Sequence, residues 1–195
     1  YPGKTRAHTF VISRSKNVRL ENITLFSGNC FGFFEMECDH NIYDHCRVTK
    51  KRNDPLRSAP RLRSNNADAF HSKFAVHGPE VTHCEFLYQG DDGIAINTSF
   101  YRVISGKANK IYVDSDTTAI KIKAGHRVRF VDYDGKVLED AKVVAVSSTG
   151  NYPQAALDSM FHLFGMKTGN RKTVVLLTLD KAVSATTGSV VSSLD

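Results

Sequence analysis

Three aspartates occupy matching places in two repeats of the sequence, each directly before a strand-like stretch. Asp68 ends the run Asn65-Asn66-Ala67-Asp68, and Asp91 and Asp92 follow Gly90. Asp68 and Asp92 are 24 residues apart, so if one repeat separates two neighbouring strands their backbones should lie about 4.8 Å apart. Hydrolysis of a glycosidic bond uses one protonated acid for the leaving oxygen and one carboxylate that activates water. We therefore predict Asp68, Asp91 and Asp92 as catalytic residues.

Other polar residues are expected to bind substrate on the same face. They share outward positions on the expected strands or belong to the basic segment before Asp68, and they are Glu35, Glu37, His71, Lys73, Asn97, Arg61 and Arg63. His71 is favoured for contact with a sugar because it follows Asp68 within one strand, and a neutral imidazole can donate one hydrogen bond and accept another. Glu37 and Lys73 fall at equivalent places, so a salt bridge between them is the structural alternative.

The elements that would position these residues repeat along the first hundred residues. Two short alternating stretches recur about every 22 to 25 residues, and such a period is typical of a parallel β-solenoid. We therefore predict a right-handed parallel β-helix with one inward column made of Phe10, Phe34, Phe70 and Ile94. Cys46 should lie beside Cys84 as a free thiol, and Asn22, His45 and His83 should stack at one bend.

The repeat is lost after Thr98. Strand-like stretches then follow at residues 110–113, 119–123, 127–133, 142–147 and 173–179, with Asp134-Gly135 as a hairpin signal and a possible short helix at residues 155–164. This pattern predicts an antiparallel all-β module. The expected organisation is a β-helix at residues 1–99, the antiparallel module at 100–183, and a tail at 184–195 that leads back toward further β-helix.

The motifs around the aspartates resemble those of glycoside hydrolase family 110. The resemblance rests on Ala67-Asp68-Ala69-Phe70-His71-Ser72, on Gly90-Asp91-Asp92-Gly93-Ile94-Ala95-Ile96-Asn97 and on Phe100-Tyr101-Arg102-Val103, and it runs over about residues 8–182. It implies an exo-acting α-galactosidase of inverting mechanism, built on a β-helix with an inserted antiparallel β-barrel, which makes the module at residues 100–183 a barrel-like insertion. Asp68 matches the proton donor, and Asp91 and Asp92 match the general-base pair. It also implies a secreted or periplasmic protein, of which this chain is a fragment.

The charge distribution and the composition limit the classes of binding partner that are expected. The net charge is +6, and it is concentrated at residues 47–63, where seven basic side chains face one acidic one: Arg47, Lys50, Lys51, Arg52, Arg57, Arg61 and Arg63 against Asp54. No aromatic residues interleave them for base stacking, so nucleic acid is not expected, and no apolar run is long enough for a membrane span. The expected partner is a carbohydrate, neutral or anionic. The sequence indicates no cofactor, no resident metal and no particular oligomeric state.

Several alternatives remain open at this stage. Each aspartate motif could be a polar turn, and clustered carboxylates also suit calcium. A polygalacturonase-like hydrolase of family 28 pairs an Asn-x-Asp motif with Asp-Asp in a similar way. A polysaccharide lyase acting on anionic glycans would use Lys73 or an arginine as its base, and a non-catalytic glycan-binding β-helix would need none of the three aspartates.

Overall fold

The computed structural model describes residues 7–51, 55, 58–59, 61–115, 120–149, 152–166 and 173–194. The chain divides into two compact units, Tyr1–Thr98 and Ser99–Asp195. The described residues form sixteen strands and one helix, which confirms the all-β prediction. Within the described residues, no helix is both long enough and apolar enough to cross a membrane.

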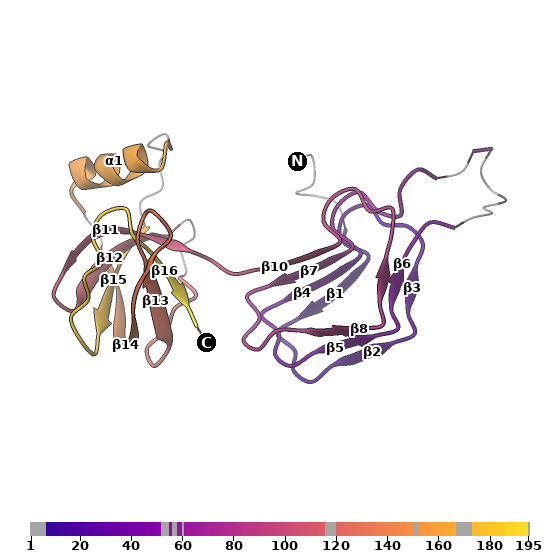
Figure 1. The fold of residues 1–195 in the computed structure, drawn as a ribbon, viewed down its shortest axis with the longest axis horizontal. Coiled ribbons are helices and arrows are strands. Elements are labelled where there is room, and N and C mark those ends of the chain that lie inside the picture. Colours follow the sequence, from indigo (N-terminus) through magenta and orange to yellow (C-terminus); the bar gives the residue numbers. More distant parts are fainter. Residues whose placement is uncertain are drawn as a thin grey trace. The chain divides into compact units, whose positions relative to one another are not determined.

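The first unit contains three short parallel sheets (Figure 1). The largest has the order β1-β4-β7-β10, and its strands are β1 (Phe10–Ser13), β4 (Phe33–Met36), β7 (Phe70–Lys73) and β10 (Ile94–Asn97). The second is made of β2 (Arg19–Glu21), β5 (Ile42–Asp44) and β8 (Glu80–Thr82). The third is made of β3 (Thr24–Leu25), β6 (Arg47–Val48) and β9 (Glu85–Phe86). Each set of one strand from each sheet, taken in chain order, is called a row below.

The prediction of a right-handed parallel β-helix was wrong. The strands of this unit are two to four residues long, and they form three separate short parallel sheets rather than a clear β-helix solenoid. The physical reason is that a sequence period specifies which strands are neighbours. It specifies neither the handedness of the connections nor whether short sheets join into a continuous coil.

The register of the predicted inward column was correct for Phe10, Phe70 and Ile94 and wrong for Phe34. Phe10 and Phe70 both pair with Phe33, whereas Phe34 pairs with His71 on the other face. Side chains of a strand alternate between faces, so a shift of one residue moves each of them to the opposite side. Adjacent phenylalanines satisfy the alternation in either register. Ile94 continues the column, but it is 49% exposed because β10 is the edge strand of its sheet.

The register error also changes the place of Glu35. Glu35 was expected on the outward face, but it pairs with Ser72 and is 1% exposed. It lies inside a core whose fully buried aromatic side chains are Phe33, Tyr43 and Phe70.

The predicted cysteine neighbours and the predicted bend are confirmed. The backbone N–H of Cys46 donates to Sγ of Cys84 at 3.3 Å, and both thiols are free. Asn22, His45 and His83 share positive φ values of 58°, 52° and 53°, and the rings of His45 and His83 stack with centroids 4.6 Å apart.

This bend gives a pH-dependent contribution to stability through Asp44. Asp44 Oδ1 accepts hydrogen bonds from His45 at 2.8 Å, His83 at 3.0 Å and Thr82 at 3.1 Å, and Oδ2 lies 2.6 Å from Arg19. The hydrogen bond from His83 is the largest cause that holds the pKa of Asp44 at about 2, below its usual 3.8.

A carboxyl whose pKa is lowered by folding stabilises the fold above its unfolded pKa, and this stabilisation is lost as pH falls through the folded value. We therefore expect the contribution of Asp44 to be complete above about pH 4 and to disappear toward about pH 2. As the pH is lowered from about 4 to about 2, the midpoint temperature of thermal unfolding should fall less steeply for Asp44→Asn than for wild type. Parallel pH profiles for the two proteins would contradict the assignment.

The second unit is a closed antiparallel barrel, which confirms the predicted barrel (Figure 1). In spatial order its strands are β11 (Tyr101–Lys107), β12 (Lys110–Ser115), β15 (Thr173–Leu179), β14 (Val137–Thr149), β13 (Arg127–Val131) and β16 (Val190–Ser193). Alternate side chains of these strands fill one core, in which Val103, Ile111, Phe130 and Leu177 are buried.

The connections of the barrel follow the local sequence signals. Asp134-Gly135 turns between β13 and β14, and Gly135 has φ 88°. Helix α1 (Gln154–Leu163) lies where a short helix was expected. The expected strand at residues 119–123 differs, because no strand is assigned at residues 120–123 and Ala119 lies outside the described residues. β16 lies within residues 184–195, the segment expected to be a tail, and pairs with β11 and β13.

Candidate active site

Asp68 is held at a fixed bend by the side chain of Asn65. Asn65 is 2% exposed, and its amide donates to the carbonyl oxygens of Ala67 at 2.9 Å and Asp68 at 2.7 Å. The same amide reaches the carbonyl oxygen of Cys30 in the previous row at 3.1 Å. These bonds fix the backbone at Asp68, which is itself buried.

The carboxyl of Asp68 is the first member of a hydrogen-bonded chain. Its Oδ2 lies 2.6 Å from Nδ1 of His71, and Nε2 of His71 lies 3.2 Å from Nδ2 of Asn97. The asparagine amide can only donate through this nitrogen. His71 thus links the carboxyl of Asp68, through Nδ1, to the side-chain amide of Asn97, through Nε2.

Asp91 and Asp92 complete a group of three carboxylates. The backbone N–H of Ala69 donates to the carbonyl oxygen of Asp92 at 2.9 Å, which sets Asp68 and Asp92 side by side in adjacent rows. One carboxylate oxygen from each aspartate lies within 4.8 Å of the others, and Asp91 and Asp92 are exposed. We call these three residues the carboxylate trio. Their oxygens are also the type of ligand that calcium prefers.

Gly90 allows the close approach that this placement requires. A Cβ at Gly90 would lie 2.6 Å from the carbonyl oxygen of Asn66, closer than any side chain tolerates. The glycine in the run Gly90-Asp91-Asp92 is thus needed to bring the two exposed carboxylates toward Asp68.

Aromatic rings lie against His71. Phe31 stacks between His8 and His71, with ring centroids 4.8 Å and 4.3 Å away, and Phe34 contacts both histidines. Burial is the main cause that lowers the pKa of His8 below 6.5, and the charge of His71 adds to it. Nδ1 of His8 is buried without a hydrogen-bond partner among the described residues.

We call the packed rings of His8, Phe31, Phe34 and His71 the aromatic wall. A hollow of about 290 Å³ adjoins it at His8. It is lined by Ala7, His8, Thr9, Ser27, Gly28, Asn29 and Arg61. The predicted Arg61 thus faces an open volume, and Nη1 of Arg63 lies 3.1 Å from where a Cβ of Gly90 would stand. Of the other basic residues of this segment, Lys50 lies over the ring of Tyr88 at 4.0 Å, while Arg52 and Arg57 lie outside the described residues.

The remaining predicted site residues do not join this group. Glu35 is buried in the core, as described above. Glu37 follows β4, and its carboxylate lies 3.2 Å from Arg14. The ammonium of Lys73 lies 5.1 Å from the ring of Phe74. The structure thus brings together Asp68, Asp91, Asp92, His71 and Asn97, with Arg61 and Arg63 nearby.

Sequence reasoning missed the aromatic wall and two further clusters of titratable residues. His8 and Phe31 precede their strands in irregular backbone, so no alternation marks them. The clusters are Asp39 with His40 and His77, and Asp44 with His45 and His83. The dipeptide Asp-His occurs at residues 39–40 and again at 44–45, and this signal could have identified both.

Comparison with protein-family models and with curated proteins found no match for this chain.

Proposed function

We propose that the carboxylate trio hydrolyses a glycosidic bond. The observation that supports this most is the combination of one buried and two exposed carboxyl groups within 4.8 Å. Like charges held so close repel one another, and a turn does not require them. A glycosidase requires a carboxyl that delivers a proton and another that receives one.

Burial and exposure divide the roles. We assign proton delivery to the glycosidic oxygen to Asp68, the buried member of the trio. Asp91 or Asp92, open to solvent, takes a proton from the water whose oxygen attacks the anomeric carbon. The bond from that carbon to the leaving oxygen breaks, and the leaving group departs as an alcohol. His71 and Asn97 hold the carboxyl of Asp68 in place.

The spacing sets a condition on the mechanism. Inverting enzymes separate acid and base by about 6.5–9.5 Å so that water fits between them, while retaining enzymes keep about 5–5.5 Å. The nearest oxygens of the trio lie within 4.8 Å. The proposed inversion therefore requires the exposed side chains of Asp91 and Asp92 to swing away from Asp68 when sugar and water bind.

The substrate that we propose is a terminal sugar in an α-galactoside-like linkage. The hollow lined by His8, Asn29 and Arg61 offers room and polar contacts to a sugar, and Arg61 and Arg63 offer positive charge to an acidic group on it. A lyase would use Lys73 or an arginine as its base. The ammonium of Lys73 lies 5.1 Å from the ring of Phe74 rather than with the carboxylate trio, so Arg61 or Arg63 would have to take that role.

The class of reaction is tested by analysis of the products. The chain is incubated with aryl α-galactosides and, separately, with uronate-containing or sulfated oligosaccharides. We expect new reducing ends without a rise in ultraviolet absorbance. An unsaturated, absorbing product would identify a lyase, and binding without any product would identify a glycan-binding module; either result would overturn the proposal.

His71→Ala is expected to lower turnover by about 10²-fold, because the carboxyl of Asp68 loses the partner that fixes its direction and small misplacements are costly. The Michaelis constant should rise less, since His71 acts mainly through Asp68. Steady-state kinetics separate the two effects. His83→Ala, which removes an exposed histidine from the bend between β8 and β9, is the matched control. Unchanged kinetics for His71→Ala would refute the role.

A further inference from the structure

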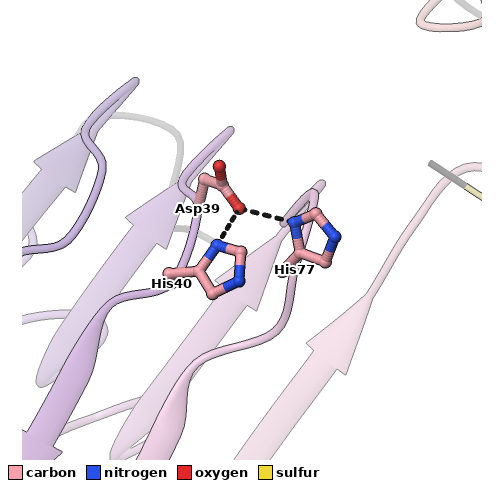
Figure 2. Close-up of side chains that lie close together, drawn as sticks. All are labelled: Asp39, His40 and His77. Atoms are coloured by element: carbon pink, nitrogen blue, oxygen red, sulfur yellow. Dashed lines mark hydrogen bonds and ion pairs between the residues drawn. The ribbon is translucent and has the colours of Figure 1, made fainter.

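Asp39, His40 and His77 converge on one point at the surface of the first unit (Figure 2). Oδ1 of Asp39 lies 2.7 Å from Nδ1 of His40 and 2.8 Å from Nδ1 of His77. The side chains of His40 and His77 are 54% and 64% exposed, and that of Asp39 is 17% exposed. Both imidazoles thus turn the same nitrogen toward one carboxylate while their other edges point away from it.

The backbone that carries these side chains is fixed by contacts between rows. The N–H of Asp39 donates to the carbonyl oxygen of Ser15 at 3.0 Å, and the N–H of His40 donates to that of His77 at 3.3 Å. His40 has φ 54°, the same left-handed conformation that its counterpart His45 adopts. Two neighbouring rows therefore present the three side chains with little backbone freedom.

We propose that Asp39, His40 and His77 form a binding site for a divalent transition-metal ion such as Zn²⁺. Two imidazole nitrogens and one carboxylate oxygen are ligands that zinc accepts, at about 2.0–2.2 Å. The three atoms lie within 4.8 Å of one another, and tetrahedral ligands at these bond lengths are about 3.4 Å apart. Each nitrogen lies 2.7–2.8 Å from Oδ1 of Asp39, so it reaches this ligand separation from the carboxylate by moving outward less than about 1 Å.

The proton balance is simple. Each neutral imidazole carries one proton, which in the hydrogen-bonded arrangement is on Nδ1. When the metal binds Nδ1, that proton resides on Nε2 instead, so both histidines stay neutral. Three protein ligands leave a further coordination position, which water fills.

The neighbouring cation distinguishes this cluster from the similar one at Asp44. Oδ2 of Asp39 lies 2.7 Å from Nζ of Lys16, whose side chain is 61% exposed. A lysine is a flexible point charge that can swing into water as the metal arrives. Oδ2 of Asp44 instead meets the guanidinium of Arg19, which presents a planar, permanently charged group.

Asp44 also carries a further hydrogen bond, from Thr82 at 3.1 Å. Asp44 thus accepts from more donors than Asp39 does, and these bonds hold the bend together. A metal ion would have to displace more hydrogen bonds at Asp44 than at Asp39. The Asp44 cluster therefore serves as an internal control that has the same residue types at the same mutual places.

The experiment is calorimetric titration of the untagged chain with zinc chloride, with Co²⁺ absorption as a second readout of coordination geometry. We expect one ion per chain, and His77→Ala or Asp39→Asn should weaken binding at least about tenfold. The matched variant His83→Ala should bind as wild type does. Lys16→Ala should bind more tightly, because a like charge next to the ion is removed.

Nitrogen-15 spectra of the histidine rings in the wild-type chain test the assignment of the ion without any substitution. Zinc should shift the Nδ1 resonances of His40 and His77 and leave those of His45 and His83 in place. No zinc binding, binding that persists unchanged in His77→Ala, or binding lost equally in His83→Ala would each overturn the proposal. The last two results would assign the ion to the thiols, the carboxylate trio or the Asp44 cluster.

Discussion

Replacing Asp68 by asparagine is expected to lower turnover by about 10²–10⁴-fold, the contribution of a positioned acid or base. The amide introduced by Asp68→Asn is close in size to the carboxyl and can still accept the 2.6 Å hydrogen bond from His71, so the bend should keep its shape. It cannot deliver a proton to a leaving oxygen. Initial rates on the best substrate and circular dichroism of the variant measure the two effects separately.

The controls for this substitution come from the same unit. Asp91→Asn and Asp92→Asn, made singly, should reveal which exposed carboxylate activates water. Glu21→Gln removes an exposed carboxylate that pairs with Arg19 and should leave turnover unchanged. If Asp68→Asn retained wild-type turnover, Asp68 would not be the proton donor.

Replacing Glu35 by alanine is expected to destabilise the first unit by about 3 kcal/mol or more, because each buried donor left without its acceptor costs about 1–3 kcal/mol. Oε1 of Glu35 accepts from the hydroxyl of Ser72 at 2.6 Å, and Oε2 accepts from Asn41 at 3.1 Å and Tyr43 at 3.0 Å. Burial, with the charge of Glu35, raises the pKa of Tyr43 well above its ordinary range, which keeps the phenol a donor.

Urea unfolding followed by circular dichroism measures this loss. Glu35→Gln keeps the volume and one acceptor oxygen, so its loss should be smaller than that of Glu35→Ala. Tyr43→Phe removes a single donor and should also cost less than Glu35→Ala. Equal stability of Glu35→Ala and wild type would mean that the buried carboxylate does not organise this core.

The sequence predicted which strands are neighbours better than it predicted the shape that they form. A spacing of 24 residues correctly paired β7 with β10, and matching strand motifs 38 residues apart placed Cys46 beside Cys84. The β-helix did not follow, because a period carries no information on how short sheets connect. Turn signals and alternation, which are local properties, predicted the antiparallel strands of the second unit, whereas the barrel was expected only from the family resemblance and its closure is a finding of the structure.

The register failed where two residues satisfied the same pattern. Phe33 and Phe34 are both apolar, so only packing decides which one enters the core, and the choice moved Glu35 from the surface to the interior. In contrast, Asp68 and Asp92 were placed by identical offsets from their strands, and the structure sets them in adjacent rows. Phe31 and His8, in irregular backbone, could not be found from periodicity.

The central claim is that the carboxylate trio hydrolyses a glycoside with Asp68 as acid and an exposed aspartate as base. Proton NMR of the first sugar released by the wild-type chain from an aryl α-galactoside, or from the anionic oligosaccharide that it cleaves, tests this most directly. We predict a free sugar whose anomeric configuration is opposite to that of the substrate. A retained anomer would make Asp91 or Asp92 a nucleophile, and an unsaturated sugar or no released sugar would contradict hydrolysis at this site.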